Sequence, residues 1–235
     1  MSNTYFTFKH FRINQDRCAM KVGTDGCLLG AWADISNSKR ILDVGCGSGL
    51  IAIMVAQRSN ATVTGIEIDP DAAAQASENV SNSPWNDRVE IICCDASNYN
   101  SDEKFDAIIS NPPFFSNSLR CPAKERTLAR HNDTLSATNM FTLAKSLLAD
   151  NGTLSVVIPC DTLQEWSDEA LFKGFSIQRM TTVRTLPHKP AKRALVEFTK
   201  GTCHKPVNNE FTLEEKPGIY SMDTKKLLQE FYLKL

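Results

Sequence analysis

The chain has 235 residues, 42% of them hydrophobic and 23% charged, which is enough for one α/β domain with a buried core. The formal net charge of −1 excludes a protein that is basic throughout, so a surface for nucleic acid would have to be a local patch. No apolar run approaches the roughly 20 residues of a membrane span, and the first residues lack the features of a signal peptide. We therefore expect a cytoplasmic protein that binds no membrane.

The eight cysteines indicate neither a metal site nor a redox motif, because no two of them have Cys-x-x-Cys spacing. Several stand within apolar runs, where cysteine packs as a small buried hydrophobe. Since disulfides are rare in the cytosol, we expect eight reduced thiols and no bound metal.

Helical and extended patterns alternate along most of the chain. Residues 1–24 are polar and aromatic, and a partly ordered arm is the simplest interpretation. Thr24-Asp25 then begins a helix over the apolar residues 27–33, which could pack across the mouth of a ligand site. Strands are expected at 40–45, 62–68, 89–94, 105–110 and 153–158, and helices at 50–58, 72–80, 135–148 and 163–172.

The last two expected strands, 176–186 and 193–199, are separated by a connection too short for a helical crossover, so they should pair antiparallel. The polar tail ends in an expected helix over 224–235. The pattern predicts an α/β fold with a Rossmann-like, doubly wound, seven-stranded, mostly parallel sheet and an antiparallel edge hairpin. We expect a single domain made of an N-terminal arm and helix (1–39), a core (40–200) and a C-terminal extension (201–235).

A glycine-rich turn follows the first expected strand and begins the next helix. Gly45, Gly47 and Gly49 would let a ligand lie close to the backbone near the helix N-terminus. The dinucleotide pattern G-x-G-x-x-G fails when read from Gly45, whereas the relaxed G-x-G-x-x-A form read from Gly47 is met by Ala52. The glycines therefore indicate a nucleoside ligand without separating a nicotinamide cofactor from others.

Carboxylates end the successive expected strands, at the sheet edge where open α/β sheets bind ligands. Glu67 could accept hydrogen bonds from both ribose hydroxyls, but Asp69 is a rival that could instead cap the next helix. Asp95 could accept from an adenine amino group or be a solvated loop residue. Asp43 points from the first strand toward the same edge.

Residues 111–114, Asn-Pro-Pro-Phe, follow the fourth expected strand. The prolines fix their own φ angles, bias Asn111 toward an extended backbone and lack N–H donors. The result is a stiff turn that presents an amide, the bare carbonyl of Pro112 and the aromatic face of Phe114. Such a turn suits an exocyclic amino group on a ring, although the same residues could form a loop capped by a core Phe.

Together, the glycine-rich turn, Glu67, Asp95 and the 111–114 motif resemble the class I S-adenosylmethionine-dependent methyltransferases that act on planar amino nitrogens. Over nearly its full length, including residues 21–26 and 129–131, the chain is similar to the bacterial tRNA(Val) adenine-N6 methyltransferases. These modify the adenosine 3′ of the anticodon, at position 37. The resemblance implies a monomer that binds the anticodon stem-loop of tRNA, with S-adenosylmethionine as its cofactor.

The resemblance also implies roles for residues. Asn111 and the Pro112 carbonyl would hold the target N6, and Phe114, which stands where many relatives carry Tyr, would stack on the base. The residues implied for the cofactor are Thr24, Asp25, Asp43, Gly45, Gly47, Gly49, Glu67, Asp95 and Asn111. In this set Glu67 would hold the ribose and Asp95 the adenine amino group. The Thr24-Asp25 pair would close over the methionine end.

Two basic clusters are candidates for contact with RNA phosphates. Between residues 178 and 205 the chain has seven basic residues and one acidic residue, and the candidates there are Lys189, Lys192 and Arg193. Arg126 and Arg130 belong to a second cluster, after the 111–114 motif. Either cluster could instead be an ordinary solvated surface.

The amino-acid sequence alone also allows other functions. A protein glutamine N5-methyltransferase acts on a planar amide nitrogen but carries a helical substrate domain, for which residues 1–39 leave little room. Methyltransferases of rRNA guanine N2 or DNA adenine N6 would also suit a basic patch. An NAD-dependent oxidoreductase would use the turn at 47–52 but leaves the 111–114 motif unexplained. A non-catalytic RNA-binding module would carry a vestigial site.

Overall fold

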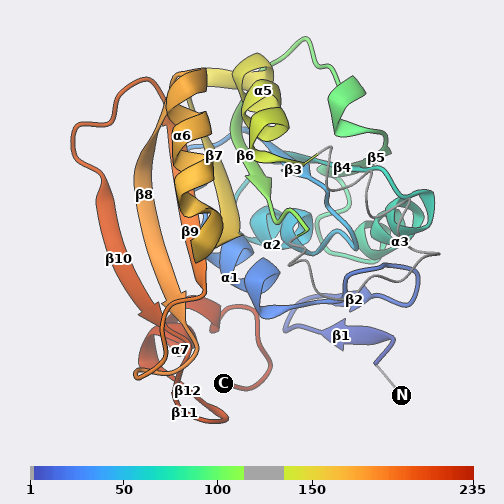
Figure 1. Ribbon diagram of the computed structural model, residues 1–235. Coiled ribbons are helices and arrows are strands. Elements are labelled where there is room, and N and C mark those ends of the chain that lie inside the picture. The colour runs from blue at the N-terminus through green and yellow to red at the C-terminus, as the bar shows by residue number, and fades with distance from the viewer. Residues whose placement is uncertain (1–2, 114–134) are drawn as a thin grey trace, which may run out of the picture.

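A large sheet forms the centre of the protein (Figure 1). The computed structural model describes residues 3–113 and 135–235, and within them the main sheet has eight strands. These strands are β3 (Arg40–Val44), β4 (Thr62–Glu67), β5 (Val89–Cys93), β6 (Phe105–Ser110), β7 (Leu148–Pro159), β8 (Phe175–Arg184), β9 (Arg193–Lys200) and β10 (Val207–Thr212). Their order across the sheet is β10-β8-β9-β7-β6-β3-β4-β5. Among these described strands β9 alone runs antiparallel to its neighbours.

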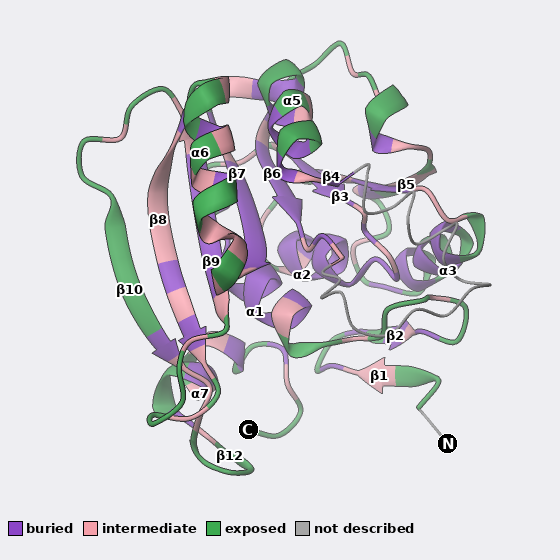
Figure 2. Ribbon diagram, viewed as in Figure 1, coloured by how far each residue is buried: buried purple, intermediate pink, exposed green. Residues whose placement is uncertain are grey.

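Helices cover both faces of this sheet (Figures 1 and 2). They are α1 (Thr24–Trp32), α2 (Leu50–Arg58), α3 (Pro70–Ser81), α5 (Ala137–Leu147) and α6 (Leu163–Lys173), with 3-10 turns η1 (Ala96–Asn98) and η2 (Cys160–Thr162). One core cluster joins α1 and α2 to Ile41 and Ile109, and the other joins α5 and α6 to Leu42 and Ile108. Adjacent residues of a strand face opposite sides, so strands buried on both faces read as continuous apolar runs.

The predicted fold class is confirmed, with one strand more than expected. β8 and β9 form the antiparallel pair that their short connection predicts. The C-terminal extension adds β10, which pairs parallel with β8 from Val207 opposite Arg179 to Thr212 opposite Arg184. The first four residues of β10 are exposed because it is an edge strand. Its sequence therefore has no apolar run from which a strand could be predicted.

The N-terminal residues form a hairpin rather than a partly ordered arm. Its strands are β1 (Tyr5–Thr7) and β2 (Arg12–Asn14). Phe8 and Phe11 in the turn are buried, and their rings stack 4.5 Å apart. The Lys9 N–H donates to the Phe231 carbonyl at 2.8 Å, and the ring centroid of Tyr232 lies 5.9 Å from that of Phe8. The hairpin is therefore packed against the C-terminal segment of the chain.

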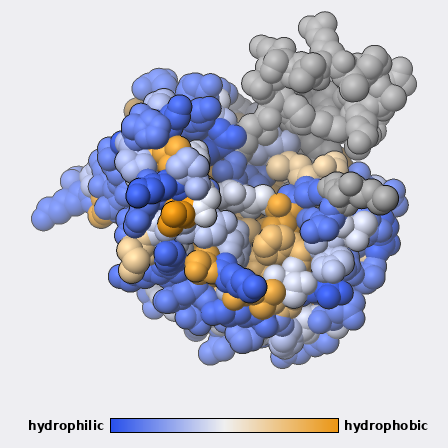
Figure 3. All heavy atoms as spheres, turned by 90° about the horizontal axis from the view of Figure 1, so that it is seen from below, coloured by the Kyte–Doolittle hydropathy of each residue, from blue (hydrophilic) through white to orange (hydrophobic). Residues whose placement is uncertain are grey.

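The rest of the C-terminal extension lies at the same end of the molecule (Figure 1). It forms β11 (Glu214–Lys216), β12 (Ile219–Tyr220) and α7 (Met222–Leu228). The helix is shorter than the one predicted over 224–235 and begins earlier, because the Ser221 hydroxyl accepts from the Thr224 N–H at 3.1 Å and caps it. Seen from below, apolar residues gather in the middle of this end, surrounded by hydrophilic ones (Figure 3).

Candidate active site

Two loops meet where the order of the strands reverses. From β3 the chain proceeds to β4 and β5 on one side and then to β6 and β7 on the other, and open α/β sheets bind ligands at such a point. The carboxyl ends of β3 and β6 lie side by side, and the Ser110 hydroxyl donates to the Val44 carbonyl at 2.8 Å. A cavity of about 760 Å³ opens there. The described residues that line it are 16–26 and 45–48, with Leu50, Ile51, Glu67, Asp69, Ala72, Asn111, Pro113 and Leu135.

The glycine-rich turn borders this cavity after β3. Gly45, Gly47 and Gly49 have φ angles of 70°, 54° and 79°, in the left-handed region that favours glycine. A Cβ on Gly47 would meet no described atom within 4 Å, so a ligand can approach its backbone, whereas a Cβ on Gly45 would lie 2.8 Å from Leu135 Cδ1. Gly49 is outside the lining, where it is the N-cap residue of α2 and packs on Ala76. Two of the three predicted glycines thus face the cavity.

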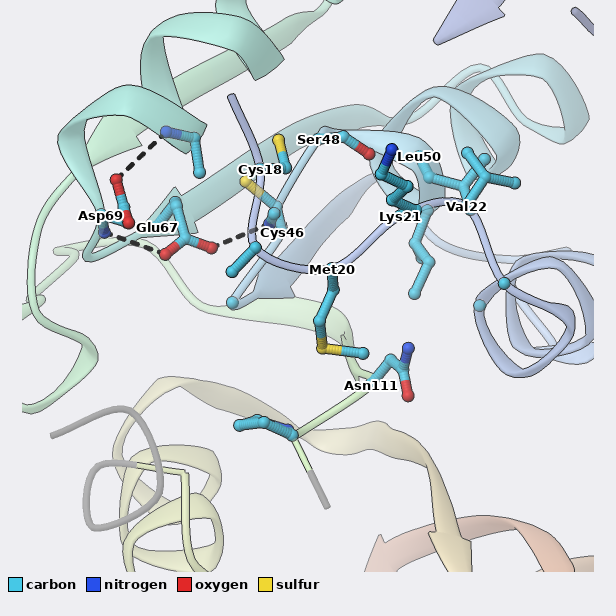
Figure 4. Close-up of a pocket in the computed structure, with 18 of the residues that line it drawn as sticks. Cys18, Met20, Lys21, Val22, Cys46, Ser48, Leu50, Glu67, Asp69 and Asn111 are labelled. Atoms are coloured by element: carbon cyan, nitrogen blue, oxygen red, sulfur yellow. Dashed lines mark hydrogen bonds between the residues drawn. The ribbon is translucent and has the colours of Figure 1, made fainter. Parts of the chain in front are cut away.

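Glu67 and Asp69 take different positions at the end of β4 (Figure 4). Glu67 is 4% exposed, and its two carboxylate oxygens accept from the N–H groups of Gly47 at 2.8 Å and Asp69 at 2.9 Å. Asp69 turns toward α3, where its Oδ1 accepts from the N–H groups of Asp71 and Ala72 at 2.9 and 3.3 Å. Asp69 therefore caps the helix, the alternative role that its sequence position allowed. Glu67 is the carboxylate held between the glycine-rich turn and the cavity.

The other two predicted carboxylates are not among the described residues that line the cavity. Asp43 is 1% exposed, its Oδ2 accepts from the Ala52 N–H at 2.9 Å, and its Oδ1 has no hydrogen-bond partner among the described residues. It anchors the first turn of α2 behind the glycines. Asp95 caps η1, accepting from the N–H and hydroxyl of Ser97, both at 2.8 Å. A contact between Asp95 and an adenine amino group stays a prediction.

Asp43 gives the protein a testable pH dependence. Burial raises the pKa of its carboxyl to about 7, although the bond from the Ala52 N–H lowers this pKa, and the nearby Glu67 charge raises it further. In the unfolded chain an Asp pKa is about 3.9, so between pH 4 and 7 the folded state binds the proton more tightly and stability falls as pH rises. The Asp43→Asn variant should lack this loss, which is up to about 1.4 kcal/mol per pH unit. Urea unfolding of both proteins at pH 5 and 7 checks this, and parallel pH profiles would contradict it.

Asn111 lines the cavity and carries an unpaired acceptor. It follows β6 directly, and its Oδ1 is buried with no hydrogen-bond partner among the described residues. Buried polar atoms are nearly always hydrogen-bonded, so an exception in a residue that lines a cavity is a candidate acceptor for a ligand donor. The first turn of α1 lies close by, since a Cβ on Gly26 would be 3.7 Å from Asn111 Nδ2. Pro112 is buried, and Pro113 lines the cavity.

Thr24 and Asp25 lie in the first turn of α1 and line the cavity. Asp25 Oδ2 accepts from Arg193 Nε at 2.9 Å, which joins α1 to the start of β9. Arg193, a candidate for RNA contact, thus engages a carboxylate at the edge of the cavity. The remaining predicted residues, Phe114, Arg126 and Arg130, lie outside the described residues.

Residues 16–22, which we call the outer wall, complete the cavity between β2 and α1. The side chain of Met20 points from this wall toward Asn111 (Figure 4). Apart from its last residues, which carry the family resemblance, this wall could not be predicted from the sequence. The segment has no motif or period, and its residues 16–18 bind a helix that is distant in the sequence.

The chemistry of the cavity fits S-adenosylmethionine, a nucleoside that carries a sulfonium cation and an amino-acid end. The Glu67 and Asp25 carboxylates offer acceptors and negative charge, and Gly47 leaves space at the backbone. Residues 3–113 and 135–235 contain no group of three His, Cys, Asp or Glu side chains that could hold a metal ion, and all cysteines among them are free thiols. No helix in these ranges is long and apolar enough to cross a membrane.

The proteins that this chain resembles in sequence are methyltransferases, which agrees with a cavity that fits S-adenosylmethionine. The family model described as methyltransferase small domain matches residues 23–162. Proteins named tRNA1(Val) (adenine(37)-N6)-methyltransferase from Bacteroides fragilis and Phocaeicola vulgatus are 46% and 44% identical, with 100% of both chains covered in each case. The protein of the same name from Yersinia enterocolitica is 39% identical over 97% of this chain and 92% of its own.

Solved structures show the same fold at lower identity. A predicted O-methyltransferase from Agrobacterium tumefaciens has a TM-score of 0.68 at 21% identity, covering 88% of this chain and 96% of its own. A putative RNA methyltransferase from Pyrococcus horikoshii has a TM-score of 0.53 at 19% identity, with 74% and 82% covered. The chain therefore belongs to the S-adenosylmethionine-dependent methyltransferases of the small-domain family and, by its full-length similarity, to the family of tRNA1(Val) (adenine(37)-N6)-methyltransferases.

Proposed function

We propose that this protein methylates N6 of adenine 37 in tRNA1(Val), as a monomer in the cytoplasm. The observation that carries the proposal is that Asn111, whose Oδ1 is buried with no hydrogen-bond partner among the described residues, lines a cavity of about 760 Å³. The full-length relatives, which are named for this reaction, support the choice of substrate.

Asn111 and Pro112 would act on the amine itself. N6 of adenine is a poor nucleophile because its lone pair is delocalised into the ring. The Asn111 Oδ1 and the Pro112 carbonyl would accept from its two N–H groups, favour a pyramidal nitrogen and direct the lone pair into the cavity. The same acceptors stabilise the positive charge that develops on nitrogen, which lowers the barrier. Bound S-adenosylmethionine supplies an electrophilic methyl group, and the protein contributes alignment.

The cofactor would lie along the glycine-rich turn. The residues proposed to hold it are Thr24, Asp25, Gly45, Gly47, Glu67, Asp95 and Asn111. Glu67 would accept from the ribose hydroxyls, since its carboxylate is already fixed by two backbone N–H groups. Asp43 and Gly49 would act indirectly, because they hold the turn and the start of α2 from behind.

The loop between β8 and β9 carries the lysines best placed for RNA. Pro159 at the end of β7 pairs with Arg193, so this loop lies at the carboxyl end of the parallel strands, as the cavity does. Lys189 and Lys192 of the loop are exposed. An adenosine must be unstacked to enter the cavity, which is easiest in a single-stranded loop such as the anticodon loop. We propose that the two lysines bind its phosphates.

Besides Arg193, two arginines of the same basic stretch are engaged within the protein. The Arg179 guanidinium lies 3.7 Å from the centroid of the Trp32 ring and pairs with Glu197 at 3.1 Å. Arg184 pairs with Glu210 at 2.7 Å. Only part of the basic stretch therefore offers free charge to a phosphate backbone.

A double substitution tests the RNA surface. The Lys189→Ala/Lys192→Ala protein should bind tRNA roughly tenfold more weakly at 0.1 M salt, because two phosphate contacts are lost. The slope of log K against log salt should become shallower by about 1 to 2. A Lys39→Ala/Lys145→Ala protein, changed at exposed lysines before β3 and before β7, is the control with equal charge loss. An unchanged slope in the first protein would remove the proposed surface.

The function itself is tested by methyl transfer from labelled S-adenosylmethionine. Unmodified total RNA, genomic DNA and total cell protein are offered separately, and nucleosides are identified by mass spectrometry. N6-methyladenosine confined to tRNA is the expected result, and digestion then maps the position. Label in protein with none in RNA would indicate amide methylation, and label in rRNA guanine or DNA adenine would indicate the other relatives of this chemistry.

A further inference from the structure

One side of α3 holds the outer wall of the cavity. Gln75, Glu78 and Asn79 are three and four residues apart and so lie on the same side of the helix. All three bind the segment 14–18, which leads from β2 into the outer wall. Gln75 and Asn79 are each 1% exposed, so their contacts are buried and not part of a solvated surface.

Gln75 binds three consecutive residues of this segment. Its Nε2 donates to Asp16 Oδ1 at 2.7 Å, and its Oε1 accepts from the Arg17 N–H at 3.0 Å and from the Cys18 thiol at 3.1 Å. Burial raises the pKa of that thiol to about 12, so Cys18 keeps the proton that it donates. Arg17 also forms an ion pair with Glu78. The start of the outer wall is therefore fixed at three points.

Asn79 joins the same segment to the glycine-rich turn. Its Oδ1 accepts from the Asn14 N–H and its Nδ2 donates to the Asn14 carbonyl, both at 2.9 Å. The second Nδ2 hydrogen goes to the Ser48 carbonyl at 2.9 Å, directly after Gly47. Both donors and one acceptor position of the amide are thereby used. An Asp or Leu of similar size offers no such donors.

These contacts connect α3 to two sides of the cavity at once. We propose that Gln75 and Asn79 are positioning residues, which hold the segment 14–18 against the glycine-rich turn and thereby set the affinity for S-adenosylmethionine. The inference rests on the proposed function, because it takes the cavity as the cofactor site. Neither residue lines the cavity, so each acts through the wall that it holds. Buried polar networks lose much of their strength when one member is changed.

Substitutions of equal size test this inference. Gln75→Glu places a carboxylate oxygen beside Asp16, and Asn79→Asp places one beside two backbone carbonyls. Each should raise the Kd for S-adenosylmethionine, measured by calorimetry, about tenfold, and should raise KM for the cofactor more than it lowers kcat. Asn82→Asp, an exposed position at the end of the same helix, is the matched control and should bind as the wild type does.

The pH dependence of cofactor binding gives a second test of Gln75→Glu. At low pH the new carboxyl can share a proton with Asp16, so the ratio of its Kd to the wild-type Kd should approach 1 between pH 7.5 and 5. The other charged or titratable groups around this point, which both proteins share, are Arg17, Cys18, Glu67, Asp69 and Glu78. A purely structural loss of packing would leave the ratio independent of pH, and that result would count against the inference.

If the variants do not fold, amide hydrogen exchange measured on the wild-type protein still tests the inference. The amides of Asn14 and Arg17 donate to α3, so their exchange should slow about tenfold or more when the cofactor saturates the cavity. Exchange that the cofactor leaves unchanged, or folded variants with the wild-type Kd, would overturn the inference. A wild type that binds no S-adenosylmethionine would instead defeat the proposed function, so the two failures are distinguishable.

Discussion

An Asn111→Ala protein should lose about 10²- to 10³-fold in the rate of methyl transfer at saturating substrates, with little change in thermal stability. Loss of rate is expected because the amide oxygen stabilises charge that develops only as the nitrogen reacts. Stability should hold because no described residue hydrogen-bonds the Oδ1 that is removed. Single-turnover rates and melting temperatures of the two proteins give both quantities.

A second variant at this position separates the acceptor from the shape of the side chain. Asn111→Asp keeps acceptor oxygens but places a charge in a buried position, so its rate should lie between those of the wild type and the Ala variant. Asn37→Ala, at an exposed position before β3, is the control and should retain the full rate. If Asn111→Ala methylates at the wild-type rate, the amide does not hold the target amine.

Glu67→Ala is expected to raise the Kd for S-adenosylmethionine by about 10²-fold. The Gly47 and Asp69 N–H groups fix the carboxylate beside the cavity, where we expect it to accept from the ribose hydroxyls. Hydrogen bonds to a charged group contribute about 1.5–3 kcal/mol, which corresponds to roughly one to two powers of ten in Kd. Calorimetric titration with the cofactor and with its demethylated product measures the loss.

Asp69→Ala is the matched comparison, because it stands two residues away and also lines the cavity. It removes the cap of α3 and should cost about 1 kcal/mol of stability while changing the Kd little. Glu67→Ala should thus mainly weaken cofactor binding, whereas Asp69→Ala should mainly lower the free energy of unfolding. If Asp69→Ala loses more affinity than Glu67→Ala, then Asp69 and not Glu67 binds the ribose hydroxyls.

The order of strands and helices could be predicted wherever burial dictates the sequence. β6 is buried on both faces and, apart from Asp106, reads as a short apolar run, so its existence and its end at Ser110 follow from the residues. Positive φ angles at Gly47 and Gly49 require glycine, which makes the turn visible as a motif. The Asp69-Pro70 pair is a helix start, and the structure uses it as one.

What escaped prediction depends on contacts between distant segments. β10 is a polar edge strand, so its pairing with β8 leaves no hydrophobic pattern. The outer wall is held by Gln75 and Asn79, which are 58 and 65 residues from the Arg17 and Asn14 amides that they bind. No local period encodes such pairs. The ion pair between the α1 carboxylate at position 25 and the first residue of β9 is of the same kind.

The packing of the N-terminal hairpin on the C-terminal segment sets a sequence of events during biosynthesis. The hairpin is made well before its partners, since the Gln229 carbonyl that accepts from Lys9 is made 220 residues later, and Phe231 and Tyr232 follow it. At roughly 5–20 residues per second, that interval is about 10–45 s. For about the second half of this interval the nascent chain contains Asn111 but lacks the support for its hairpin. Methylating capacity should therefore begin only after residues 229–232 have been made and have packed on the hairpin.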